Sequence, residues 1–139
     1  MGNQREPFEA STFFHVFNHG NGDDNIFRCD NNYGYFLRKY ADHIVPIAET
    51  FAYCLMPNHF HFLVRIRDED QLVKLFDLPP DPQGFENLAG LVSRRFGNFL
   101  NAYAKAYNKM YDRKGSLFLD NLNRKKVDRE DYLCRLVHY

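Results

Sequence analysis

Two spacings of apolar residues alternate along the chain, and they predict the order of its strands and helices. Runs rich in β-branched and aromatic residues predict strands at residues 13–19, 47–56 and 60–67. Pro57-Asn58 joins the last two with typical turn chemistry, so these strands are expected to form an antiparallel pair. Apolar residues that recur at three and four predict a helix over residues 31–45 and a longer helix over residues 85–110.

The remaining segments carry weaker patterns. Residues 68–84 are acidic and rich in proline, so they are expected to connect elements and to hold at most a short helical turn. Residues 116–127 fit either a strand or an irregular basic loop, and Asp128 with Asp131 resembles the N-terminal capping pair of a last helix. This order of elements indicates an α+β fold in which helices cover an antiparallel sheet.

The composition is that of one folded domain. The chain has 139 residues, of which 45% are apolar and 17% aromatic, and this is enough for one hydrophobic core. No stretch approaches the ~20 uncharged apolar residues of a membrane helix, and the N-terminus lacks the apolar block of a signal peptide. We therefore expect a cytoplasmic protein with no membrane partner. Cys29, Cys54 and Cys134 are odd in number and far apart, which argues against a disulfide framework and a zinc ribbon.

The net charge is zero, but the charges are unevenly distributed. Residues 1–90 carry an excess of six acidic groups and residues 91–139 an excess of six basic groups. A polyanion such as DNA is therefore expected to meet the C-terminal half. The candidate phosphate contacts are Arg94, Arg95, Arg124, Lys125 and Lys126. The alternative is that these charges are ordinary solvated helix faces, and charge counts alone favour it.

His59 and His61 raise a chemical question, because they lie one residue apart in the apolar run YCLMPNHFHFLVRI. Side chains alternate between the two faces of a strand, so the four apolar residues Phe60, Phe62, Val64 and Ile66 would share the face opposite the histidines. Two imidazoles on one face can converge on a divalent metal, provided that a carboxylate, amide or water completes the site. The alternative is a pair of surface histidines that are hydrogen-bonded to their neighbours.

The string MPNHFHFLV closely resembles the histidine-hydrophobe-histidine motif of the single-tyrosine HUH transposases, particularly the branch of REP-associated tyrosine transposases. HVFNHGN resembles the first strand and turn of that family, GSLFLDNLNRKKV the segment before its last helix, and EDYLCRLVHY its tyrosine helix. The stretch DNLN departs from the basic and aromatic run of relatives, which puts the DNA contacts of that segment in question. The resemblance covers most of the chain, and MPNHFHFLV is its most specific part.

This resemblance implies a ferredoxin-like HUH fold in which His59 and His61 bind Mg²⁺ or Mn²⁺ and Tyr139 is the nucleophile. It also implies a function, namely the nicking and rejoining of single-stranded or hairpin DNA through a 5′-phosphotyrosine. Tyr139 has a simpler alternative, because Tyr132, Leu136 and Tyr139 would form one buried helical stripe. Tyr132 is the competing candidate for the nucleophile.

Other functions stay open at this stage. The chain could be a domesticated relative that binds structured DNA without cutting it, or an unrelated metal enzyme with an HxH site, and it could act as a monomer or a homodimer. In the family the tyrosine helix continues beyond the nucleophile, and a polar residue four positions on supplies a further metal ligand. Because the sequence ends at Tyr139, we expect residues 1–139 to be a single transposase-like domain truncated in its tyrosine helix, with poor nicking activity.

Overall fold

The computed structural model describes residues 5–79, 87–119 and 121–127. Seven named elements follow one another along these residues: β1 (Phe13–His19), α1 (Asp30–Ile44), β2 (Ala48–Met56), β3 (His59–Ile66), α2 (Glu69–Phe76), α4 (Leu88–Met110) and β4 (Asn123–Val127). The bounds of β1 are those that the apolar pattern predicts, and those of α1, β2 and β3 differ from prediction by at most one residue at each end. The predicted last helix from Asp128, with Tyr132 and Tyr139, lies outside the described residues.

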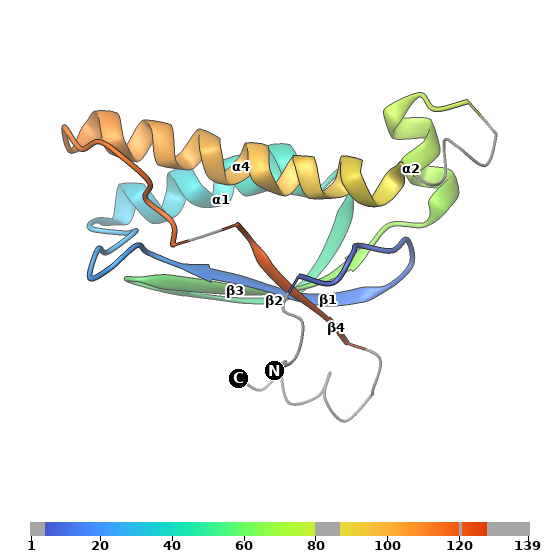
Figure 1. Cartoon of the computed structure of the whole chain (residues 1–139), viewed down its shortest axis with the longest axis horizontal. Coiled ribbons are helices and arrows are strands. Elements are labelled where there is room, and N and C mark those ends of the chain that lie inside the picture. The colour runs from blue at the N-terminus through green and yellow to red at the C-terminus, as the bar shows by residue number, and fades with distance from the viewer. Residues whose placement is uncertain (1–4, 80–86, 120, 128–139) are drawn as a thin grey trace.

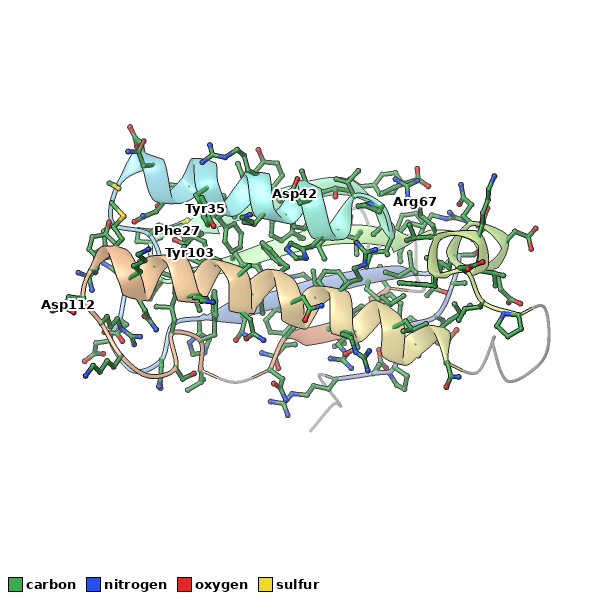
Figure 2. The ribbon with its side chains drawn as sticks, turned by 90° about the horizontal axis from the view of Figure 1, so that it is seen from above. Phe27, Tyr35, Asp42, Arg67, Tyr103 and Asp112 are labelled. Atoms are coloured by element: carbon green, nitrogen blue, oxygen red, sulfur yellow. The ribbon has the colours of Figure 1, made fainter. Side chains whose placement is uncertain are left out.

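The strands form one antiparallel sheet in the order β2-β3-β1-β4. The two central strands, β1 and β3, pair along their whole length, from Phe13 opposite Arg65 to His19 opposite His59. Helices α1 and α4 lie side by side on one face of the sheet, which we call the inner face (Figure 1). In the view from above both helices run roughly along the direction of β1 and β3, with Phe27, Tyr35 and Tyr103 grouped near one end (Figure 2). The predicted fold, an antiparallel sheet covered by helices, is confirmed.

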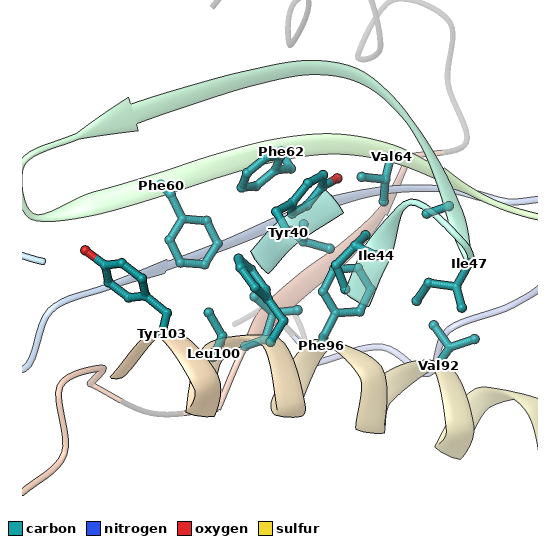
Figure 3. Packing of buried hydrophobic residues seen from close by; sticks show 14 of the residues in the cluster. Tyr40, Ile44, Ile47, Phe60, Phe62, Val64, Val92, Phe96, Leu100 and Tyr103 are labelled. Atoms are coloured by element: carbon teal, nitrogen blue, oxygen red, sulfur yellow. The ribbon is translucent and has the colours of Figure 1, made fainter. Parts of the chain in front are cut away.

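The core lies between the inner face and the two helices, and aromatic rings fill much of it. Phe60 and Phe62 point from β3 toward Phe36 of α1, with ring centroids 5.2 and 6.2 Å away. Phe36 is fully buried and also contacts Phe99 of α4 at 4.8 Å. Figure 3 shows these layers interdigitating around Tyr40, with its ring stacked on that of Phe62 at 4.1 Å. Burying such rings supplies most of the driving force for this fold.

The segment after β3 is more regular than predicted. In place of at most one turn, residues Glu69–Phe76 form an eight-residue helix, α2. Asp68 caps it: its side chain accepts from the backbone of Gln71, and the Gln71 side chain accepts from the backbone of Asp68. Leu72 anchors the helix in the core. The acidic residues that suggested a connecting segment therefore serve to start a helix.

The basic segment before residue 128 contains a strand. Residues Asn123–Val127 form β4, which pairs with β1 at the edge of the sheet, while residues 116–119 and 121–122 are irregular. Among the described helices, none is long and apolar enough to cross a membrane.

Candidate metal centre on the outer face of the sheet

The face of the sheet opposite α1 and α4, here called the outer face, gathers four histidines from the two central strands. His15 and His19 come from β1, and His59 and His61 come from β3. Strand alternation turns the intervening residues, such as Val16 and Phe60, into the core, where both are almost fully buried. His19 lies opposite His59 in the register, and His61 lies opposite Phe17. The sequence predicts that His59 and His61 lie on the face opposite the apolar residues of β3, and the structure places them there.

The residue pattern alone assigned no role to His15 or His19. The sequence does contain a pattern that points to these two histidines, because the run FFHVFNH alternates between faces in the same way as HFHFLVRI. No local pattern gives the register between β1 and β3, because α1 and β2 separate these strands in the sequence. That register places the two histidine-bearing strands side by side.

The turn that precedes His59 is held against the chain that follows β1. The Gly20 N–H donates to the carbonyl of Asn58 at 2.8 Å, and the N–H groups of Ile26 and Phe27 donate to the carbonyl of Pro57 at 2.8 and 3.1 Å. Gly20 must be glycine for space, because a Cβ there would lie 2.4 Å from the backbone oxygen of Asp24. These contacts fix the end of the sheet where His19 and His59 meet.

Each histidine of the HxH pair has a hydrogen-bond partner at its Nδ1 atom. His59 Nδ1 is 2.8 Å from Oδ1 of Asn58, and His61 Nδ1 is 2.8 Å from Nε2 of His15. The His59 and His61 rings are nearly perpendicular, at 87°, with centroids 5.2 Å apart. A recess of about 320 Å³ lies over them, lined by Phe17, Asn18, His19, Asn58, His59 and His61.

The surroundings of His15 and His61 favour the neutral form of both rings. Burial, followed by the neighbouring His61 and Lys125, lowers the pKa of His15 to about 4. Burial, followed by His59, also lowers the pKa of His61. Only a neutral imidazole has a lone pair for a metal, so these shifts favour metal binding at neutral pH.

The donor set at this face fits a divalent ion that takes part of its coordination from elsewhere. Within residues 5–79, 87–119 and 121–127, no three or more His, Cys, Asp or Glu side chains are arranged to hold a metal together. Histidines that bind a metal through one ring nitrogen are nonetheless usually hydrogen-bonded at the other, as His59 and His61 are at Nδ1. The two rings would therefore supply part of the coordination of an ion. Water and phosphate oxygens would complete it, as they do for Mg²⁺ and Mn²⁺ in phosphate-processing sites.

The predicted basic contacts divide between the two sides of the sheet. Lys125 of β4 is exposed and lies opposite His15 in the register, so it belongs to the outer face. Arg124 and Lys126 alternate to the other side and make contacts within the protein. The guanidinium of Arg124 lies 4.9 Å from the Phe8 ring centre and donates to the Glu6 carbonyl at 2.9 Å, and Lys126 pairs with Glu9 at 2.7 Å.

Arg94 and Arg95 lie in the helical layer, on α4, so the structure does not bring them together with the histidines. Arg94 is exposed, and the guanidinium of Arg95 lies 5.7 Å from the ring centre of Phe76 in α2. A larger recess of about 750 Å³ also lies on the helical side, between α4 and a lining that includes residues 115–119, 121, 122 and 124, and none of the four outer-face histidines lines it.

Comparisons with known proteins give structural neighbours only. No family model and no curated protein matches the chain. Among solved structures, a REP-associated tyrosine transposase bound to a REP hairpin matches with a TM-score of 0.62 and 11% identity, covering 100% of this chain and 70% of that one. A proposed transposase from Deinococcus radiodurans R1 matches with a TM-score of 0.44 and 12% identity, covering 99% of this chain and 95% of that one.

The first of these likenesses shows the fold. The chain has the α+β architecture of a REP-associated tyrosine transposase, with a four-stranded antiparallel sheet beneath helices. That neighbour is a REP-associated tyrosine transposase, the family whose motif the MPNHFHFLV string resembles.

Proposed function

We propose that this protein is a transposase-like DNA-processing enzyme that nicks and rejoins single-stranded or hairpin DNA with the help of Mg²⁺ or Mn²⁺. One observation carries the proposal: the HxH pair lies on the outer face of a transposase-type sheet, and both imidazoles are hydrogen-bonded at Nδ1. The neighbour with the same fold is bound to a REP hairpin, which supports a hairpin DNA as the partner.

His59 and His61 would hold the metal in this proposal. A bound divalent ion polarises a nonbridging phosphate oxygen and stabilises the charge that builds up on it. The residues of the chain orient the substrate: the rigid β3 strand fixes the spacing of the two imidazoles, and the recess beside Phe17 gives a phosphate access to them.

Tyr139 is the proposed nucleophile, and it lies outside the described residues. Its phenolic oxygen would attack the phosphorus and form a Tyr–O–P bond while the P–O3′ bond breaks. The phenol gives up its proton, the 3′ oxygen takes one up and leaves as a free hydroxyl, and the step is balanced in protons. The phosphotyrosine keeps the energy of the broken bond, so rejoining to another 3′-hydroxyl needs no nucleotide cofactor.

Lys125 is the best-placed basic residue for a DNA phosphate near the metal, because it is exposed on the same face as the histidines. Arg124 contacts Glu6 and Lys126 contacts Glu9. To bind DNA, each side chain would have to release this contact or contact a phosphate at the same time. Arg94 and Arg95 remain candidates for DNA that extends over the helical layer.

The test is a search for a covalent protein–DNA adduct with a DNA hairpin that carries a single-stranded flank, in the presence of Mn²⁺. DNA labelled at its 3′ end should migrate with the protein on a denaturing gel, because the tyrosine keeps the 5′ phosphate of the 3′ fragment. DNA labelled at its 5′ end should release a shorter free strand. His59→Ala, His61→Ala and Tyr139→Phe should each abolish both products, and Tyr132→Phe should not.

Two results would contradict the proposal. An adduct that survives Tyr139→Phe but not Tyr132→Phe would move the nucleophile to Tyr132. Hairpin binding without cleavage or adduct under any divalent ion, both by the wild-type chain and by a variant whose helix is extended beyond Tyr139, would favour a protein that binds structured DNA without cutting it.

A further inference from the structure

Each histidine of the HxH pair is held at its Nδ1 atom by a side chain from outside the pair. The partner of His59 Nδ1 is the side-chain oxygen of Asn58, at 2.8 Å. The partner of His61 Nδ1 is the Nε2 atom of His15, also at 2.8 Å. Both partners come from outside the pair, one from the turn and one from the neighbouring strand β1.

The chemistry of these partners sets the position of the proton on each ring. The oxygen of a carboxamide only accepts, so His59 must donate from Nδ1, and its lone pair is then on Nε2. His15 and His61 share one hydrogen bond between two ring nitrogens, so one ring donates and the other accepts. Only if His61 donates does it carry its proton on Nδ1 and its lone pair on Nε2, as His59 does.

We infer that His15 and Asn58 are positioning residues, which accept from His61 and His59 respectively and so present the Nε2 lone pairs of both histidines for metal binding. This inference rests on the proposed metal function of the pair and assigns residues to it that bind neither metal nor DNA. Ring partners of this kind fix the tautomer and orientation of metal-binding histidines, and their loss typically costs about 10–100-fold in metal affinity.

The packing around His15 supports a positioning role. The His15 ring stacks on that of His61 at 5.0 Å with an interplanar angle of 20°, and it lies 4.8 Å from the ring of Phe17. His15 is therefore held by ring contacts as well as by its hydrogen bond. An imidazole held in this way keeps its acceptor atom in a constant place, which a flexible side chain would not.

The first measurement needs no metal. Long-range ¹H–¹⁵N correlation spectra of the metal-free protein, with ¹⁵N-labelled histidine in mildly alkaline buffer, report which nitrogen of each ring carries the proton. The wild-type protein should show His59 and His61 protonated at Nδ1. Either ring protonated mainly at Nε2 would overturn the assignment for that ring.

Matched variants then separate the acceptor from the packing. His15→Phe keeps an aromatic ring but removes the acceptor, whereas His15→Gln places an amide oxygen near the position of Nε2. In the same way Asn58→Ala removes an acceptor and Asn58→Asp keeps one. His15→Phe and Asn58→Ala should each populate the Nε2–H tautomer of their partner and lower Mn²⁺ affinity by about 10–100-fold. His15→Gln and Asn58→Asp should recover most of the Nδ1–H tautomer and of the Mn²⁺ affinity. His43→Phe on α1 is the control, which should change neither the tautomers nor the affinity.

Three further results are informative. Unchanged tautomers and affinity in His15→Phe would overturn the role of His15. An equal loss of affinity in His15→Gln and His15→Phe, with tautomers unchanged, would mean that His15 ligates the ion itself, which also overturns it. If the wild-type protein shows the Nδ1–H tautomers, and these depend on His15 and Asn58, but it binds no Mn²⁺, the positioning assignment stands and the proposed metal function fails.

Discussion

The two faces of the sheet are built from the same four strands, but they follow opposite rules. On the inner face, residues such as Phe14, Val16 and Phe60 are at most 1% exposed and pack against α1 and α4. On the outer face, the alternating partners of these residues are His15, Phe17 and His61, which are only half-buried. The inner face therefore supplies stability. The outer face can carry polar side chains because the fold does not depend on burying it. This division predicts that substitutions will affect either the fold or the function according to the face on which they lie.

The largest expected effect is in the core that packs on the inner face, at Phe36 of α1. Phe36→Ala removes a fully buried ring that contacts Phe60, Phe62 and Phe99, and it should lower the free energy of unfolding by about 3–5 kcal/mol. Phe51→Ala is the matched control, because Phe51 is 52% exposed and its ring contact is with Phe13. It should cost about 1 kcal/mol, the value of one aromatic pair. Urea unfolding of both variants measures the difference, and equal costs would remove the distinction between the two faces.

A smaller effect is expected at Gly20, which packs against the turn before His59. Gly20→Ala places a Cβ against the Asp24 carbonyl, so it should destabilise the protein by about 1–3 kcal/mol through overpacking. Gly97→Ala is its control on α4, where a Cβ meets nothing within 4 Å, and it should stabilise the helix by about 0.5–1 kcal/mol. Thermal melting of both variants gives the signs. A stable Gly20→Ala protein would show that the turn before His59 is not tightly held.

How much of this could be read from the sequence differs between the two faces. Alternation within a single strand separates Phe60 and Phe62 from His59 and His61, and helical spacing places Phe36 and Phe99 in the core, so the inner face was predictable. The outer face needs two strands in register, and the pairing of His19 with His59 joins strands that are far apart in the sequence, so no local pattern encodes it. This is why the sequence singled out the HxH pair but did not find His15 as the partner of His61.

The basic segment shows the same limit. The run Arg124-Lys125-Lys126 reads as one basic cluster in the sequence, but strand alternation sends Lys125 to the outer face and its two neighbours to the other side. The contacts of Arg124 and Lys126 with residues 6 and 9 join parts of the chain that are more than a hundred residues apart, so no local pattern could predict them.

The smallest expected effect is on DNA affinity. Lys125→Glu should weaken the binding of single-stranded DNA several-fold for all sequences and reduce the slope of log affinity against log salt by about 1. Lys105→Glu makes the same charge change on an exposed site of α4 and should leave affinity nearly unchanged. Fluorescence anisotropy across a salt series measures both. If Arg94→Glu had a larger effect than Lys125→Glu, the DNA would lie on the helical layer instead.

The most direct test of the central claim is a titration of the metal-free protein with Mn²⁺, followed by electron paramagnetic resonance and paired with thermal melting. We expect one ion to bind per chain, and His59→Ala and His61→Ala should each lower its affinity by at least about tenfold while costing about 1 kcal/mol of stability or less. His43→Ala on α1 should change neither quantity. Unchanged Mn²⁺ affinity in both variants would make His59 and His61 ordinary surface histidines and would contradict the proposed role of the outer face.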